Sequence, residues 1–212
     1  MAEGKSGRSS VVFIFILLTQ ILAVMVFVPS DFIDSTRVTE IRWLETIYFD
    51  DTIIWIADTS YWLYDILVQK TGLADTIRWA FTPGPDNSEV SGLGRNVFFP
   101  YLQDRGVALE ALAHLMIIRA VAIAVWFPLY VIILMPSLVD GLIERRIKRE
   151  TFSYPSPMKH RMGLKMDFFV IFLIIAGLLS PIPIPPLILP MTLAVSLAVT
   201  GIMVVGNLPK KL

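Results

Sequence analysis

The chain has 212 residues, 55% of them hydrophobic, and its mean hydropathy of +0.68 is high for a soluble domain. Eighteen Lys and Arg residues balance eighteen Asp and Glu residues, although the two signs are segregated along the chain. The absence of cysteine excludes a disulfide framework, a thiolate nucleophile and a cysteine-ligated metal site.

The first predicted element is a transmembrane helix at residues 11–29, after a short cytoplasmic tail at residues 1–10. Residues 11–28 carry no charge and only two polar side chains. A helix of that length crosses a hydrocarbon core of about 30 Å at about 1.5 Å per residue. A cleaved signal peptide is the alternative. Its apolar region is usually about 7–15 residues long and precedes a small-x-small cleavage site, which is not found here.

Residues 30–115 are predicted to form an acidic, Trp-rich helical segment on the extracytoplasmic side. The segment has thirteen Asp or Glu residues against six Lys or Arg residues, a balance of −7. Apolar residues recur at steps of three and four, which is typical of amphipathic helices. The expected helices cover residues 39–56, 61–72 and 73–81, and a turn at residues 82–95 precedes a last helix from about Gln103.

Four of the five tryptophans fall in this segment, and three of them are candidate contact residues: Trp43, Trp55 and Trp62. Aromatic side chains with a polar tip favour the interface between membrane and water. One interpretation is a set of amphipathic helices on the outer bilayer surface, with membrane lipid as the partner. The other is a small helical domain with a Trp-rich core or a partner-binding face.

Residues 116–139 are predicted as the second transmembrane helix. Pro128 and Pro136 lie within it, and a kink is expected because proline removes a backbone hydrogen bond and clashes with the preceding turn. Arg119 is its one charge. The long side chain of Arg119 is a candidate interface anchor, since it can extend from the start of the helix to the headgroups.

Residues 140–166 are predicted as a basic cytoplasmic loop, entered by a helix that leaves the bilayer. The loop is a candidate contact surface for protein partners. Direct nucleic-acid binding is not expected, because the basic stretch is short and contains acidic residues. The candidate contact residues are Arg145, Arg146, Lys148, Arg149, Lys159, His160 and Arg161.

Residues 167–206 are predicted as a transmembrane hairpin of two helices, the third and fourth spans. The uncharged apolar stretch within it is interrupted at residues 180–186 by alternating prolines, which cannot continue a helix. A re-entrant hairpin that does not cross completely is the alternative. A short basic tail follows at residues 207–212.

The fold class predicted from these elements is an all-α integral membrane protein with about four transmembrane helices. Lys and Arg are enriched in the tail at residues 1–10, the loop at 140–166 and the tail at 207–212. Positive flanks face the cytoplasm. An even number of spans places all three there, so cytoplasmic N- and C-termini are expected.

No catalytic or metal-binding motif is found in the sequence, and no cofactor, metal or catalytic residue is expected. Asp50, Asp51, Asp58 and Asp65 are best explained as a solvated helical face. The alternative hypothesis is a small interfacial membrane enzyme or lipid-handling protein. It would require Glu110, His114 and Arg119 to converge at one depth, although a direct helical pair with Arg119 is not well spaced.

The cytoplasmic loop and the segments after it resemble a family of bacterial conjugation membrane proteins from integrating conjugative elements and conjugative plasmids. The resemblance is carried by the Val-Asp-Gly-Leu stretch at residues 139–142, the Arg-rich helix that follows and the aromatic-Ser-Pro connector at residues 152–157. A Pro-rich hairpin at residues 178–190 and the basic tail at 207–212 come next. The family has no established activity.

The resemblance implies a non-enzymatic inner-membrane component of a conjugative DNA-transfer, or type IV secretion, system. Such a protein would act in channel assembly or mating-pair function through contacts with other conjugation proteins, and it could form an oligomer. An exclusion protein, which blocks transfer into cells that already express it, is a further alternative.

Overall fold

The structure is a computed structural model that describes residues 4–81, 98–154 and 156–208, with the backbone alone in residues 4–10. Within these ranges the regular secondary structure is entirely helical, which confirms the predicted all-α class. The chain divides into two compact units, Met1–Ala122 with Leu178–Pro185 (unit 1) and Ile123–Gly177 with Pro186–Leu212 (unit 2). The turn predicted at residues 82–95 lies outside the described residues.

Unit 1 combines the N-terminal helices with most of a long helix from the middle of the chain. Two apolar clusters form its core. One joins α1, α2 and α5 and the other joins α2 to α5. The elements are α1 (Gly4–Phe27), α2 (Ser30–Ile47), α3 (Asp50–Tyr64), the π-helical turn η1 (Asp65–Gln69), α4 (Leu73–Phe81) and α5 (Phe99–Val125) as far as Ala122. The buried core residues are Val24, Ile33, Ala108, Leu112 and Leu115 in the first cluster and Leu44, Ile118 and Ala122 in the second.

A sharp bend of 112° separates α1 from α2. Pro29 lies at the bend with extended backbone angles (φ −72°, ψ 156°), so the first helix ends at Phe27 and a new one begins at Ser30. The Ser30 hydroxyl donates a hydrogen bond of 2.5 Å to Asp104 Oδ1 on α5. The bend is therefore anchored to the long helix of the same unit.

The prediction of a single helix at residues 39–56 is wrong, because helical structure is interrupted between α2 and α3. Phe49 is extended (φ −71°, ψ 154°) and α3 starts immediately after it. Asp50 and Asp51 occupy the first turn of α3, where negative charge interacts favourably with the helix dipole. Gly72, at φ +75°, provides the left-handed residue just before α4, and α4 covers the residues predicted for it.

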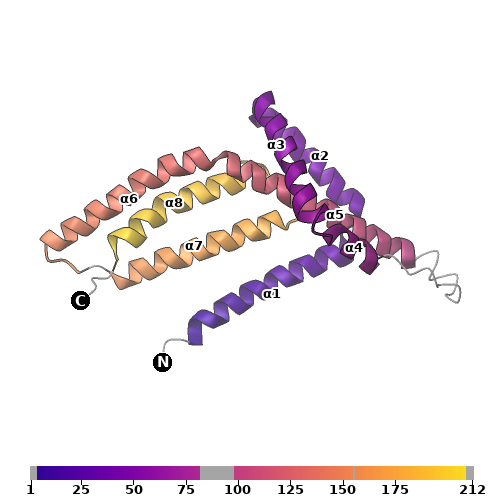
Figure 1. Cartoon of the computed structure of the whole chain (residues 1–212). Helices are drawn as coiled ribbons and strands as arrows, with labels where there is room; N and C mark the ends of the chain where they lie inside the picture. Colours follow the sequence, from indigo (N-terminus) through magenta and orange to yellow (C-terminus); the bar gives the residue numbers. More distant parts are fainter. Residues whose placement is uncertain (1–3, 82–97, 155, 209–212) are drawn as a thin grey trace. The chain divides into compact units, whose positions relative to one another are not determined.

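Unit 2 contains the end of α5 together with α6 (Phe127–Glu150), α7 (Pro157–Leu178, as far as Gly177) and α8 (Ile188–Gly206). Helices α6 and α8 lie side by side and run in parallel, because Ser137 bonds to residues 197 and 198 while Lys148 bonds to residues 206 and 207 (Figure 1). Helix α7 runs antiparallel to α8, since His160 contacts Val204 whereas Asp167 contacts Ser196.

The predicted proline kink is replaced by a helix boundary. Helix α5 ends at Val125, and Pro128 lies in the first turn of α6, where a missing backbone N–H leaves no intrahelical bond unmade. Pro136 remains inside α6. The end of the basic loop is helical as well, because α7 begins at Pro157 and includes Lys159, His160 and Arg161.

Small residues allow α6 and α8 to approach closely. A methyl group added at Gly141 would lie 2.9 Å from Val205 Cβ and 3.1 Å from the Gly201 carbonyl oxygen. The Ser137 hydroxyl lies at the same interface and donates to the Ala198 carbonyl at 2.8 Å. Small residues and hydroxyl bonds of this kind are characteristic of helix pairs in membranes.

Three described helices are long and apolar enough to cross a membrane: α5, α6 and α8. The bent pair α1 and α2 could provide a fourth crossing, so three to four spanning helices agree with the predicted number. Helix α7, which contains the predicted third span, is not among them and carries Arg161, Lys165 and Asp167. The membrane boundaries at residues 11–29, 116–139 and 167–206 remain predictions.

Candidate functional site

The most extensive buried polar site in unit 1 is centred on Arg119 of α5. Its side chain is 5% exposed and that of Glu40, on α2, is 4% exposed. Arg119 Nη2 lies 2.5 Å from Glu40 Oε1, and Arg119 Nε lies 3.0 Å from Glu40 Oε2. The pair is therefore bidentate, the geometry that gives the strongest and most directional contact between guanidinium and carboxylate.

The same two side chains bind the backbone of the proline-rich segment at residues 178–184. Arg119 donates to the carbonyl oxygens of Leu178, Ser180 and Ile182 at 3.2, 2.6 and 2.8 Å. Glu40 Oε1 accepts a hydrogen bond of 2.7 Å from the Ile184 backbone N–H. A segment whose prolines prevent a helical hydrogen-bond ladder is thus satisfied by side chains from two helices.

The structure places Arg119 inside unit 1, paired with Glu40, and its role as an interface anchor remains a prediction. Sequence spacing pointed to residues of its own helix and missed Glu40, which is 79 positions earlier. One signal was available. The buried residues Ile33, Thr36, Glu40 and Leu44 recur at steps of three and four on α2, which places a carboxylate on the inward face of that helix.

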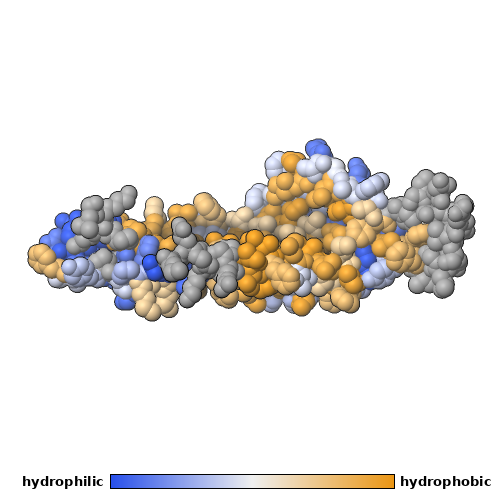
Figure 2. Space-filling view, turned by 90° about the horizontal axis from the view of Figure 1, so that it is seen from below, coloured by the Kyte–Doolittle hydropathy of each residue, from blue (hydrophilic) through white to orange (hydrophobic). Residues whose placement is uncertain are grey.

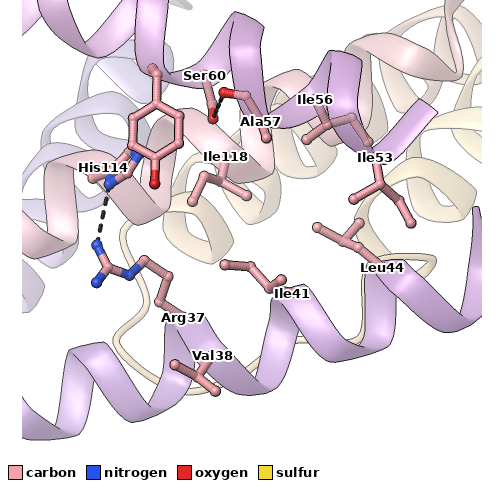
Figure 3. A pocket seen from close by; sticks show the side chains of 11 residues that line it. Arg37, Val38, Ile41, Leu44, Ile53, Ile56, Ala57, Ser60, His114 and Ile118 are labelled. Carbon is pink, nitrogen blue, oxygen red and sulfur yellow. Dashed lines mark hydrogen bonds between the residues drawn. The ribbon is translucent and has the colours of Figure 1, made fainter. Parts of the chain in front are cut away.

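A second site is an apolar cavity of about 230 Å³ between α2, α3 and α5 of unit 1. Ile41, Ile56 and Ile118 supply one apolar side chain from each helix, and Figure 3 shows them around the cavity. His114 and Arg37 line one end, where Arg37 Nη1 lies 3.2 Å from His114 Nδ1. The cavity therefore combines apolar walls with one polar end.

Two tyrosine rings hold the imidazole of His114 in place. The centroids of Tyr61 and Tyr64 each lie 5.0 Å from that of His114, with tilted ring planes. Burial, reinforced by the negative charge of Glu110, raises the pKa of Tyr64, so its hydroxyl stays protonated at neutral pH.

The three residues of the enzyme hypothesis have different partners. Glu110 accepts two hydrogen bonds from Arg78 of α4, at 2.8 and 2.9 Å. His114 contacts Arg37, and Arg119 contacts Glu40. Each of the three α5 residues therefore contacts a different partner on α4 or α2. No contact found among the described residues brings the three together in one site.

The basic contact residues of unit 2 fall into two groups. Arg146, Arg149, Lys159 and Arg161 are exposed, while Arg145 is half-buried. Lys148 and His160 instead bind the C-terminal end of α8: Lys148 Nζ lies 2.8 Å from Asn207 Oδ1, and His160 Nδ1 lies 3.1 Å from the Val204 carbonyl oxygen. These donors satisfy groups at the helix end that lack helical partners, and the positive charge of Lys148 interacts favourably with the helix dipole there.

The exposed basic residues lie at one end of unit 2. The end of α6, the start of α7 and the end of α8 meet there, and Figure 2 shows hydrophilic residues gathered at that end. Apolar side chains remain exposed along the helices, including Ile132 of α6 and Val195 of α8. This distribution is expected of helices that lie in lipid and end at a charged surface.

The tryptophans of unit 1 do not form a buried core. Trp55, Trp62 and Trp79 are exposed and Trp43 is half-buried, so a Trp-rich core is excluded for these residues. A lipid-facing or partner-facing role for Trp43, Trp55 and Trp62 remains a prediction.

A family model described as IncC plasmid conjugative DNA transfer protein DtrJ-like matches residues 34–205. The match confirms the resemblance to conjugation-associated proteins and extends it from the C-terminal part of the chain into unit 1. No curated protein and no solved structure matches the chain.

Proposed function

Because the chain belongs to the DtrJ-like family of IncC plasmid conjugative DNA transfer proteins, we propose that it is a non-enzymatic inner-membrane component of the conjugative transfer apparatus. It acts in assembly of the type IV secretion channel, or in mating-pair function, through contacts with other conjugation proteins and with membrane lipid. The family match carries the transfer role. The long apolar helices support the membrane location.

The helix directions in unit 2 support the proposed topology. Because α6 and α8 are parallel, the end of α6 and the end of α8 lie at the same end of the unit. The first turns of α7 join them there. Residues 140–166 and the C-terminal tail are then both cytoplasmic, in agreement with the enrichment of positive charge in short cytoplasmic flanks.

The exposed basic residues are the proposed cytoplasmic contact surface. Four basic side chains are exposed: Arg146 and Arg149 near the end of α6, and Lys159 and Arg161 on α7. Lys148 and His160 differ from them because they bind the end of α8. Arginine is favoured at protein interfaces because its planar guanidinium makes several directed hydrogen bonds. On the extracytoplasmic side, Trp55 and Trp62 offer a second contact surface.

Photo-crosslinking in mating cells tests the contact proposal. A photoreactive amino acid at Arg149 or Arg161 is expected to trap conjugation proteins in donor cells that carry the whole transfer system. Donors that express this chain alone provide the control. Identical crosslinks with and without the transfer genes would contradict the proposal. Reduced transfer into recipients that express the chain, with unchanged donor function, would identify an exclusion protein instead.

A further inference from the structure

The end of unit 2 that carries the exposed basic residues is held together by one buried side chain, that of Asn207. Its Oδ1 accepts hydrogen bonds from Lys148 Nζ of α6 at 2.8 Å and from the Ser156 backbone N–H, just before α7, at 3.3 Å. Its Nδ2 donates to the Met203 carbonyl of α8 at 3.0 Å. Asn207 is only 2% exposed, so the end of α6, the start of α7 and the end of α8 are held at one level.

The length of α8 relates that level to the membrane. Helix α8 has 19 residues, none of them charged, and ends at Gly206. At about 1.5 Å per residue it is roughly 28 Å long, close to the thickness of about 30 Å of a hydrocarbon core. A helix of this length that crosses the core, as proposed above, ends within the headgroup layer. The end of α6 and the start of α7 then lie in the same layer, because they bind the end of α8.

The charge at this level is strongly positive, and Figure 2 shows the hydrophilic residues gathered at this end. Residues 140–166 contain seven Lys or Arg residues against three Asp or Glu residues, and Glu144 is already paired with Lys148 at 2.6 Å. Four exposed basic side chains form no ion pair with any acidic residue that the structure describes: Arg146, Arg149, Lys159 and Arg161. Unpaired cations in the headgroup layer attract phosphate groups, and a guanidinium binds a phosphate through two parallel hydrogen bonds.

Two aromatic side chains of the connector between α6 and α7, Phe152 and Tyr154, lie at the same end and are almost fully exposed. The backbone of Phe152 is left-handed (φ 53°), which is rare for a large side chain. The Thr151 hydroxyl holds this turn, since it donates to the Ile147 carbonyl at 2.8 Å. Aromatic rings are unfavourable in water and favourable in the interfacial layer of a bilayer. Exposed rings beside unpaired cations therefore favour a lipid surface over a soluble phosphate.

We infer that this end of unit 2 binds anionic phospholipids of the cytoplasmic leaflet, with the four unpaired basic side chains against their phosphates and the two exposed rings among their headgroups. Anionic headgroups fit better than zwitterionic ones, because the amine of a zwitterionic headgroup would bring a further positive charge to a surface that is already basic. The inference deepens the proposed lipid contact and rests on the proposed membrane placement of α8. It does not depend on the role in transfer.

Lipid titration of the purified full-length protein tests the inference with two charge-matched variants. Arg146→Gln/Arg149→Gln removes two positive charges from the end of α6, and Arg42→Gln/Lys70→Gln removes two exposed positive charges from unit 1. Delipidated protein in detergent is titrated with dioleoylphosphatidylglycerol or dioleoylphosphatidylcholine, and bound lipids are counted by native mass spectrometry. Wild type and the unit 1 variant are expected to prefer the phosphatidylglycerol. The α6 variant should bind it about tenfold more weakly, the order expected for two basic residues near an anionic surface.

A second variant and a soluble competitor complete the test. Lys159→Gln/Arg161→Gln removes two charges from α7 and is expected to weaken phosphatidylglycerol binding similarly, which covers the case in which the α6 variant fails to fold. Excess glycerol 3-phosphate should leave the lipid bound, because it lacks acyl chains, and displacement would assign the site to soluble phosphate instead.

Equal binding of the two lipids by wild type, or equal phosphatidylglycerol binding by wild type and all variants, would overturn the inference. Variants that keep the lipid preference but lose crosslinks to transfer proteins would assign the surface to protein contacts alone. The titration uses purified protein, so its result is distinguishable from a failure of the proposed transfer role.

Discussion

Arg119 and Glu40 form a buried ion pair, in which each side chain compensates the charge of the other. Their charges are desolvated, but each is hydrogen-bonded to its partner and to the backbone of residues 178–184. Loss of one partner leaves an uncompensated buried charge, which typically costs about 3–5 kcal/mol. The exposed pair of Arg78 and Glu110 has similar bidentate geometry but a solvated arginine.

We expect Arg119→Met to lower the free energy of unfolding by about 3–5 kcal/mol, and Glu40→Leu to have a similar effect. The double variant Glu40→Leu/Arg119→Met should lose less than the sum of the single variants, because no charge is left unpaired. Chemical unfolding in detergent measures these values. Arg78→Met is the control and should cost much less, because the Arg78 guanidinium is exposed to solvent. A loss for Arg119→Met as small as that control would contradict the proposed importance of the buried pair.

At the level of elements, local sequence signals predicted where some helices begin and end better than they predicted which helices contact one another. Gly72 and the start of α4 followed from turn chemistry, and the helical character of both units followed from apolar periodicity. The break at Phe49 was missed because apolar periodicity continues through it. Long-range contacts, above all that of Glu40 with Arg119, depend on how helices meet, and residue spacing within one helix does not encode that.

The pairing of α6 with α8 provides the element-scale prediction. Gly141→Ala places a methyl group against Val205 Cβ and the backbone of α8, neither of which can easily move, whereas Gly206→Ala meets the carboxylate end of the flexible Glu144 side chain. We expect Gly141→Ala to destabilise the protein by about 1–3 kcal/mol and Gly206→Ala to cost much less. Thermal unfolding followed by circular dichroism distinguishes them. Equal losses would show that close backbone contact does not limit this helix pair.

For the whole molecule, the segregation of charge gives a topology that can be tested directly. The absence of native cysteine makes single-cysteine variants specific. Phe49 and Tyr154 are both highly exposed, at 88% and 95%, so either position accepts a label wherever a membrane-impermeant maleimide can reach it. We expect Phe49→Cys to be labelled in cells with an intact inner membrane and Tyr154→Cys only after that membrane is permeabilised. Labelling of Tyr154→Cys in intact cells would contradict cytoplasmic placement of residues 140–166.

The transfer frequency of a donor with a clean in-frame deletion tests the central claim most directly, since it asks whether conjugation needs this protein. Because the chain belongs to a family of conjugative DNA transfer proteins, we expect the deletion to lower the transfer frequency. The full chain supplied in the donor should restore transfer, whereas supply in the recipient should not. Transfer at the wild-type frequency from the deleted donor, with growth and other plasmid functions unchanged, would contradict a role in the transfer apparatus.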